Sequence, residues 1–323
     1  MISPRMSSMY DAVRRSFLFF FKILWRRKKA FTGFMILLIV YVIPAILAVT
    51  GLIPKLPPAK AGWENMYAPP SFNDFPWYIF GTEFTGRPLL LCLIWGIPSA
   101  LAIAFLAGLF TIGIGLIIGL SAGYIGGLWD SIAGIIMDVA LCIPSIFLAL
   151  IFAAILPTDL KKNPFIIAAI LSITAWAWLA RSVRAQVFSL KKKDVILIAK
   201  AMGFRTWKII FDDIMRYLMP FIFMSLIMST VSAIAGYFGI AFLGLFPVDV
   251  TNWSIQLNQA MSYLGALGLI RGGKAQLGFW LPTIMMILIQ VALVNISEIV
   301  EELFNPVLRV RLLGEIKKEK VGS

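Results

Sequence analysis

Side chains that could carry acid–base, nucleophilic or metal chemistry are sparse in this sequence. The 323 residues include no histidine and two cysteines, Cys92 and Cys142, each inside an apolar run. A histidine base or ligand is therefore excluded, and a zinc, haem or disulfide framework is disfavoured. No pair of carboxylates and no Ser/His or Cys/His set stands out in the sequence. We predict that the chain is not itself an enzyme and has no catalytic residue and no metal site.

One glycine-rich segment approaches the spacing of a phosphate-binding loop. Residues 268–275 read GLIRGGKA, but Ala275 stands where such a loop needs Ser or Thr. The segment also lies between two apolar runs, whereas a phosphate-binding loop joins a strand to a helix. We interpret it as a glycine-rich loop and not as a nucleotide site.

Asp138 is the acidic residue that lies clearly inside an apolar run. An ionisable side chain in a membrane span is costly, so it is a functional candidate by default. A single carboxylate is, however, more often a hydrogen-bonded contact between helices. We keep Asp138 as a candidate intramembrane polar site and leave both explanations open.

The composition places these residues in a membrane protein. Mean hydropathy is +0.90 and 60% of residues are hydrophobic, which is too apolar for a water-soluble globule. The net charge of +13 could indicate nucleic-acid binding. The basic residues, however, cluster at the ends of apolar runs and not along a stripe, so they report membrane topology. We predict a multi-pass protein of the cell membrane, in contact with lipid and not with nucleic acid.

Six apolar runs follow one another, and about 20 residues suffice to cross a hydrocarbon core of ~30 Å. The second run is longer than one crossing needs, which predicts a tilted or broken span with Pro98 as a kink site. Residues 1–30 form a basic arm, 54–88 a proline-rich loop, 247–277 a second surface loop and 304–323 a basic tail. Residues 89–303 contain five of the runs and a polar region at 190–217. The expected spans are residues 31–53, 89–121, 131–156, 164–179, 218–246 and 278–300.

Charge asymmetry orients these spans. Most of the 29 lysines and arginines fall on the side shared by the two ends of the chain and the polar region at 190–217. Because basic loops stay in the cytoplasm, we predict that both termini and this region are cytoplasmic, and that residues 54–88 are extracytoplasmic.

A stripe of small residues marks the second span. Gly115, Gly119 and Gly123 recur every four residues and so lie on one helical face. Such a face allows another helix to pack closely, and we predict a helix-packing role for the three glycines.

Residues 194–220 are the most distinctive stretch, because a polar segment interrupts two apolar spans. Asp194 stands at an N-cap position and Gly203 at a helix stop, so a short helix is expected between them. Thr206 can cap a second helix, whose apolar face comprises Trp207, Ile210, Phe211 and Ile214. Two helices joined at a glycine can present a knob to a partner, or they can lie as amphipathic helices at the membrane interface.

Ordered motifs resemble those of the C-type permease subunits of dipeptide and oligopeptide ABC importers, from about residue 17 to residue 311. FGTEFTGR at residues 80–87 is similar to a segment that precedes the second span of that family. GLSAGYIGGLWD at 119–130, followed by Asp138 and IPS at 143–145, is similar to another. TAWAWLARSVRAQVFSLKKKD at 174–194 matches a third, and Gly203 and Pro220 match the glycine and proline of the EAA coupling motif.

The resemblance implies an all-α fold with six transmembrane helices, the MetI-like fold of type I importers. It implies a second homologous permease subunit, two cytoplasmic ATPase subunits that bind ATP and Mg²⁺, and an extracytoplasmic substrate-binding protein. This chain would then hold no cofactor itself. The residues expected to couple to the ATPases are Asp194, Leu197, Ile198, Ala199, Ala201, Gly203, Trp207 and Pro220.

The sequence departs from the family pattern at the coupling motif, and two alternative functions stay open. Leu197, Ile198 and Ala199 stand where the family has Glu-Ala-Ala, so the motif glutamate is missing. Peptides are the expected substrates, but the same machinery could import oligosaccharides. An ion-coupled secondary carrier is the alternative of another class, disfavoured because Asp138 stands nearly alone among the apolar spans.

Overall fold

The computed structural model describes residues 24–304 except 26, 61, 63, 73, 245–248 and 272–274. Within these residues the chain is helical and forms no strand beyond an isolated bridge between Thr82 and Pro88. The all-α prediction is confirmed for this part of the chain. The basic arm and the basic tail lie almost entirely outside the described residues.

The helices follow the apolar runs of the sequence, with several boundaries that differ from expectation. Their bounds in chain order are α2 Lys28–Ile36, the π-helix η1 Leu37–Val42, α3 Ile43–Val49, α4 Leu89–Ile125, α5 Gly127–Cys142, α6 Ser145–Ile155, the 3-10 helix η2 Leu160–Lys162, α7 Pro164–Ser172, α8 Trp176–Leu190, α9 Asp194–Ala201, α10 Thr206–Lys208, the π-helix η3 Ile209–Ile214, α11 Met215–Phe242, α12 Trp253–Arg271 and α13 Gln276–Phe304.

Four continuous helical stretches are long and apolar enough to cross a membrane. They are Lys28–Val49, Leu89–Ile125, Thr206–Phe242 and Gln276–Glu298. Two further spans arise only if each of two bent helix pairs counts as one, which gives a total of up to six among the described residues. The expected six-span architecture is therefore met in its coarse form, as a helical membrane protein with four to six spans.

The third and fourth expected spans, 131–156 and 164–179, each correspond to a bent pair of helices and not to one continuous helix. Helices α5 and α6 meet at 75°, because Pro144 cannot donate the backbone hydrogen bond that would continue α5. Helices α7 and α8 meet at 56°, and α8 continues to Leu190, beyond the expected end of the span near residue 179.

Two other prolines, Pro98 and Pro220, lie inside helices and do not end them. Pro98 lies inside the 37-residue helix α4, which is continuous and not broken at that position. Pro220 lies inside α11, so the second helix of the polar region and the fifth span form one stretch, Thr206–Phe242. The helix thus begins 12 residues before the expected start of that span near residue 218. Neighbouring helices can compensate the hydrogen bond that a proline removes.

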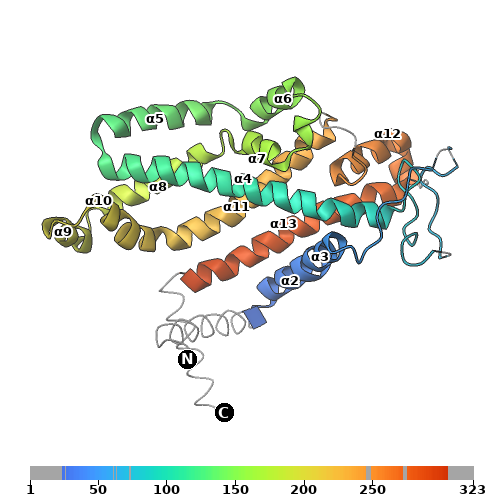
Figure 1. Cartoon of the computed structure of the whole chain (residues 1–323), viewed down its shortest axis with the longest axis horizontal. Helices are drawn as coiled ribbons and strands as arrows, with labels where there is room; N and C mark the ends of the chain where they lie inside the picture. The colour runs from blue at the N-terminus through green and yellow to red at the C-terminus, as the bar shows by residue number, and fades with distance from the viewer. Residues whose placement is uncertain are drawn as a thin grey trace, which may run out of the picture.

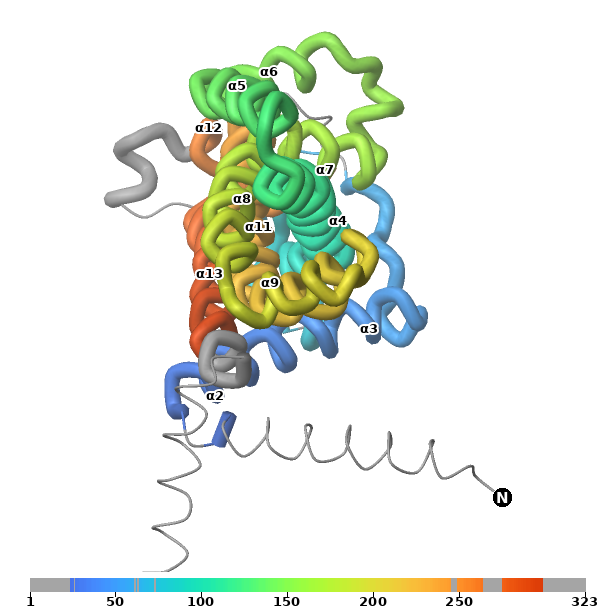
Figure 2. Tube along the Cα trace, turned by 90° about the vertical axis from the view of Figure 1, so that its left-hand side faces the viewer, coloured from blue at the N-terminus to red at the C-terminus, as the bar shows by residue number. Residues whose placement is uncertain are grey.

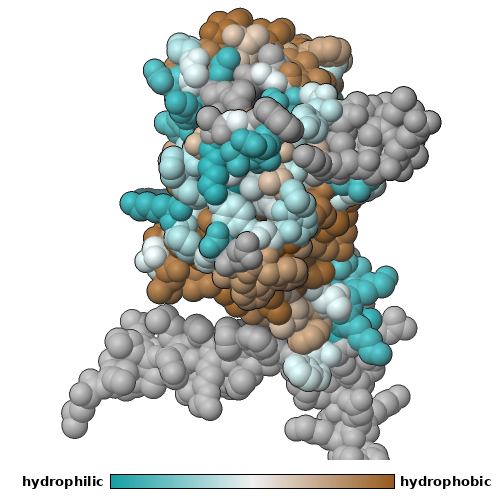
Figure 3. All heavy atoms as spheres, turned by 90° about the vertical axis from the view of Figure 1, so that its right-hand side faces the viewer, coloured by the Kyte–Doolittle hydropathy of each residue, from teal (hydrophilic) through white to brown (hydrophobic). Residues whose placement is uncertain are grey.

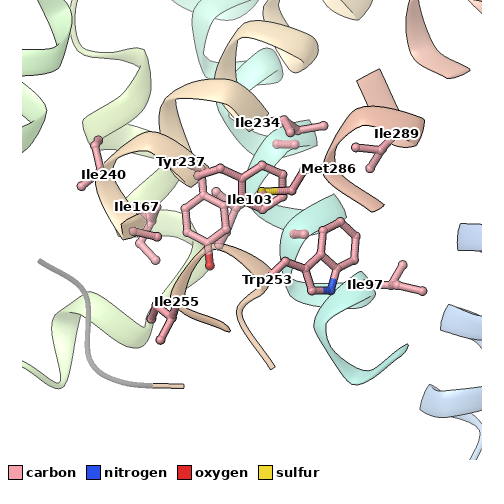
Figure 4. Packing of buried hydrophobic residues seen from close by; sticks show 14 of the residues in the cluster. Ile97, Ile103, Ile167, Ile234, Tyr237, Ile240, Trp253, Ile255, Met286 and Ile289 are labelled. Carbon is pink, nitrogen blue, oxygen red and sulfur yellow. The ribbon is translucent and has the colours of Figure 1, made fainter. Parts of the chain in front are cut away.

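The second expected surface loop, residues 247–277, mostly forms helix α12. Trp253, at its first turn, is 1% exposed, and its indole N–H donates to the Leu93 carbonyl oxygen at 2.9 Å. Figure 4 shows this indole in the apolar cluster that also contains Ile97 and Met286. Residues 268–271 belong to α12 and residues 272–274 lie outside the described residues, so the segment does not start as a loop.

Helix α4 is central, and it packs against α8, α11, α7 and α3. The molecule is elongated, with α9 at one end and with residues 51–88 and α12 at the other (Figure 1). Helix α2 begins and helix α13 ends toward the end that carries α9 (Figure 1). The polar region and the two surface segments are therefore at opposite ends of the helices.

Candidate functional site

Helix α9 and the residues that follow it form an exposed apolar surface at one end of the molecule. Ile196 and Ala199 are buried, and they contact the apolar cluster that includes Ile209 and Ile210. The other apolar side chains of the segment face outward without a covering element among the described residues. Exposed apolar side chains of this kind are typical of a contact with another protein or with a membrane interface. Its members, here called the α9–η3 surface, are Val195, Leu197, Ile198, Met202, Phe204, Trp207 and Phe211.

The turn after α9 has the hydrogen bonds of a Schellman motif. Gly203 has φ +75°, and its N–H donates to the Lys200 carbonyl oxygen at 3.1 Å. The N–H of Phe204 donates to the carbonyl oxygen of Ala199 at 3.2 Å. This left-handed conformation is the one that glycine adopts at the lowest cost. No atom lies within 4 Å of the position that a Cβ atom would take on Gly203, so the requirement comes from φ and not from crowding.

The start of α9 differs from expectation. Asp194 is the first helical residue, and the N-cap is Lys193, with no side-chain capping hydrogen bond. The carboxylate of Asp194 therefore lies in the first turn, where it interacts favourably with the positive end of the helix dipole. Arg205, not Thr206, is likewise the N-cap of α10.

The second helix of the region divides its apolar residues between two faces. Trp207 is 70% exposed and stacks on Phe211, with ring centroids 6.1 Å apart, whereas Ile210 and Ile214 are buried. The single apolar face expected from α-helical spacing is therefore wrong. Residues Ile209–Ile214 form a π-helix, whose wider turn rotates Ile210 and Ile214 away from Trp207.

The glycine stripe of α4 lies against α8, and Figure 2 shows these two helices beside one another. A Cβ atom on Gly119 would lie 2.6 Å from the Ala180 carbonyl oxygen. One on Gly123 would lie 2.8 Å from the carbonyl oxygen of Arg184, and one on Gly115 would lie 2.7 Å from the Leu179 side chain. At the two later glycines the backbone of α8 is thus the obstacle, and a backbone moves less readily than the end of a side chain.

Helix α5 is tied to α8 by two ion pairs. Asp138 pairs with Arg181, which lies just beyond the expected fourth span. Asp130 pairs with Arg184 through two hydrogen bonds, of which the one from the Arg184 Nη2 atom is 2.7 Å long. Arginine binds a carboxylate with two parallel N–H groups, and this geometry orients one helix on the other.

A cavity of about 610 Å³ lies between α4, α6, α7, α8 and α11. Its polar side-chain groups are hydroxyls and the indole N–H of Trp178, and none of the described residues that line it is charged. Among the described residues, no group of three or more histidine, cysteine, aspartate or glutamate side chains is placed to hold a metal ion. The hydroxyl-bearing and aromatic residues that line the cavity are Thr111, Ser145, Ser229, Ser232 and Trp178.

A helical membrane protein with an exposed, glycine-hinged apolar surface at one end agrees with what sequence comparison finds. Residues 115–310 match the model of the family described as "Binding-protein-dependent transport system inner membrane component". Because this match covers more than half of the chain, the chain belongs to that family. It begins within the glycine stripe and includes the α9–η3 surface.

Individual relatives carry the names of permease subunits, which confirms the resemblance inferred from the motifs. The dipeptide transport system permease protein DppC of Bacillus subtilis is 29% identical over 259 residues, covering 78% of this chain and 77% of the relative. The oligopeptide transport system permease protein OppC of the same organism is 28% identical over 201 residues, covering 62% and 63%. The nickel transport system permease protein NikC of Escherichia coli is 26% identical over 185 residues, covering 57% and 65%.

Sequence reasoning missed three features of the site. The partner of Asp138 was visible in principle, because Arg181 is also a charged residue beside an apolar run. The π-helix Ile209–Ile214 has no signal in the spacing of the residues, since the same residues fit an α-helical face. The cavity depends on three-dimensional packing and could not be read from the sequence.

Proposed function

We propose that this chain is one of two permease subunits of an ATP-driven importer, and that it forms half of a translocation pathway for dipeptides and oligopeptides. Membership of the binding-protein-dependent transport family and the names of the peptide permeases among the relatives support the proposal. The single observation that carries it is the exposed apolar α9–η3 surface around Gly203.

The α9–η3 surface is the docking site for a cytoplasmic ATPase subunit. Two such subunits bind ATP and Mg²⁺, and this chain holds no cofactor. Closure of the ATPases on ATP displaces α9 and the following turn. Because Thr206–Phe242 is one helical stretch of 37 residues, it carries this displacement over about 55 Å to the opposite end of the molecule. The span thereby changes between outward-facing and inward-facing arrangements.

The end of the molecule that carries α9 is cytoplasmic in this proposal, and both termini lie on that side. The charge asymmetry of the sequence supports this orientation, because the lysine run Lys191–Lys193 and most other basic residues belong to that side. An extracytoplasmic binding protein delivers the peptide to the opposite end. Residues 51–88 and α12 are the segments that it meets there.

The cavity of about 610 Å³ is the part of the pathway that this chain supplies, and a second homologous permease closes it from the other side. Hydroxyl groups without charges suit a pathway that must release peptides of different sequence. Helix α6, the second half of the bent pair α5 and α6, borders this cavity through Ser145 and Ala149. A bend at Pro144 is a place where the wall can move.

Purification of the tagged chain with its associated subunits, followed by reconstitution into liposomes, tests the function. We expect uptake of a labelled dipeptide only with internal ATP and external binding protein, and no uptake driven by a proton or sodium gradient alone. Gradient-driven uptake without ATP would identify an ion-coupled carrier and contradict the proposal. Parallel assays with labelled oligosaccharides, and a binding screen of the cognate binding protein, distinguish peptide from sugar import.

A further inference from the structure

A second cavity, of about 400 Å³, lies near the extracytoplasmic end of the helices and is lined by more positive than negative groups. Its volume is within the usual range for small-ligand sites. Three basic residues, Arg87, Lys161 and Lys162, line it together with one carboxylate, that of Asp249. Lys162 and Asp249 are both exposed, so the cavity opens at the surface. Figure 3, which faces this end of the molecule, shows hydrophilic residues at its centre beside a hydrophobic surface.

Arg87 is held in place by a folded turn. The carboxylate of Glu83, 1% exposed, accepts hydrogen bonds from the Thr85 N–H at 2.8 Å and from the Arg87 N–H at 3.1 Å. The Glu83 N–H donates to the Arg87 carbonyl oxygen at 2.9 Å. Burial raises the pKa of Glu83 above its usual value, and these hydrogen bonds oppose that rise. The turn therefore fixes the backbone of Arg87 at the cavity.

The two lysines of the cavity form no ion pair among the described residues, and Arg87 interacts electrostatically with the buried carboxylate of Glu83. The Nε atom of Arg87 is buried without a hydrogen-bond partner, and neither Lys161 nor Lys162 forms an ion pair there. Asp249 already accepts hydrogen bonds from the N–H and the hydroxyl of Thr251, both at 2.9 Å. If the carboxylates of Glu83 and Asp249 are both counted against Arg87 and the two lysines, positive charge still remains in excess. A buried unpaired guanidinium nitrogen is costly unless an acceptor from outside the chain reaches it.

The remaining walls suit an organic anion better than an inorganic one. Ile103, Ile167 and Val250 supply an apolar side, and Tyr237 and Asn252 supply polar atoms. The Asn252 side-chain N–H donates to the Tyr237 hydroxyl at 2.9 Å. Figure 4 shows that this hydroxyl points away from Ile234 in the apolar cluster. The cavity thus combines cations, which can bind a carboxylate, with an apolar wall, which can contact a neighbouring side chain of variable size.

We propose that this cavity, here called the carboxylate pocket, receives the C-terminal carboxylate of the incoming peptide at the extracytoplasmic entrance of the pathway. Arg87 and the two lysines bind the carboxylate, and the apolar wall contacts the last side chain. This inference rests on the proposed function and adds selectivity to it. A free peptide fits the pocket, whereas a neutral oligosaccharide lacks the anion and Ni²⁺ is repelled by the excess positive charge.

Uptake of a free dipeptide and of its C-terminal amide, measured with the reconstituted complex and its binding protein, tests the pocket. We expect the wild-type complex to take up the free dipeptide with a KM at least about tenfold lower than that for the amide. The substitutions Lys161→Gln and Lys162→Gln together should raise the KM for the free dipeptide by a similar factor and leave the amide unaffected. Lys55→Gln, at an exposed lysine of the same end, is the matched control and should change neither KM.

The remaining outcomes are also decisive. The exposed single variant Lys162→Gln should raise the KM for the free dipeptide by a smaller factor than the double Gln variant. If the double Gln variant fails to assemble, this single variant tests the pocket, and the charge-conserving double variant Lys161→Arg with Lys162→Arg should keep the wild-type KM. Equal KM values for the free and amidated dipeptides in the wild type would overturn the pocket but not the proposed function. No uptake of either dipeptide would overturn both. If the lysine effect disappears in liposomes of neutral lipid, the pocket binds a lipid phosphate and the proposal is wrong.

Discussion

The backbone N–H of Phe204 donates to the carbonyl oxygen of Ala199 at 3.2 Å, and this bond closes the C-terminal end of α9 around Gly203. Ala199 is buried on the inner side of α9, while Phe204 belongs to the exposed α9–η3 surface. The bond therefore connects the inner packing of the segment to its outer contact surface. A partner that pushes on Phe204 also pushes on the packed side of α9.

Aspartate at Ala199 and at Ala201 should fail in different ways. Ala199 is 7% exposed, so Ala199→Asp buries a carboxylate and should destabilise the packing of α9 by about 1–3 kcal/mol. Ala201 is exposed, so Ala201→Asp should leave α9 folded and weaken ATPase attachment. Limited trypsin cleavage at Lys200 and Arg205, together with the amount of co-purified ATPase, separates the two effects. Equal trypsin sensitivity of both variants would contradict the structure of this segment.

Replacement of Gly119 by leucine should separate α4 from α8. A Cβ atom there would meet the Ala180 carbonyl oxygen at 2.6 Å, and overpacking of this kind costs about 1–3 kcal/mol. We expect Gly119→Leu to lower the yield of assembled complex and its thermal midpoint. Leu116→Ala, one turn earlier and only partly buried, should have a mild effect. Similar yields for the two variants would rule out close packing at Gly119.

The ion pair between Asp138 and Arg181 should behave as a coupled unit. Asp138→Asn or Arg181→Gln alone leaves one charge unpaired next to apolar spans, which is unfavourable. The double variant removes both charges, so its loss of thermal stability should be smaller than the sum of the two single losses. The expected coupling is about 0.5–3 kcal/mol. Strictly additive losses in a double-mutant cycle would show that the pair contributes nothing.

Accessibility of single cysteines tests the orientation. In a background without Cys92 and Cys142, cysteines at Lys60 and Met261 should react with an impermeant reagent from outside. Cysteines at Lys192 and Lys318 should react only after the membrane is opened. Met261 is chosen because it is exposed, whereas the side chain of Asn258 donates to the Phe242 carbonyl oxygen at 2.8 Å. Labelling of Lys192 from outside would reverse the proposed topology.

The fold was predictable to the extent that hydropathy and glycine chemistry determine it. The long helices coincide with apolar runs, because a membrane span must satisfy its backbone internally. Gly203 was located correctly as a helix stop, since a left-handed residue after α9 leaves few alternatives to glycine. Trp253 shows the limit: its segment was expected to be a loop, but an indole buried against Leu93 fixes a helix there.

The site was less predictable, because its geometry depends on contacts between distant segments. Asp138 was recognised as unusual, but its partner Arg181 lies 43 residues away and on another helix. Residue spacing placed Trp207 and Ile210 on one face, and a π-helix separates them. The carboxylate pocket joins Arg87, Lys161 and Asp249 from three separate segments, so no local pattern could indicate it.

The number of ATP molecules hydrolysed per peptide imported, measured side by side in wild type, Gly203→Val, Gly203→Asn and Lys192→Gln, tests the central claim most directly. Valine resists φ +75° whereas asparagine tolerates it, and both side chains have room. We predict that Gly203→Val stays in the membrane but loses ATPase subunits or hydrolyses ATP without import. Gly203→Asn should hydrolyse a number of ATP molecules per peptide that is closer to the wild-type number, and Lys192→Gln should match wild type. Full and tightly coupled import by Gly203→Val would mean that the coupling site lies elsewhere.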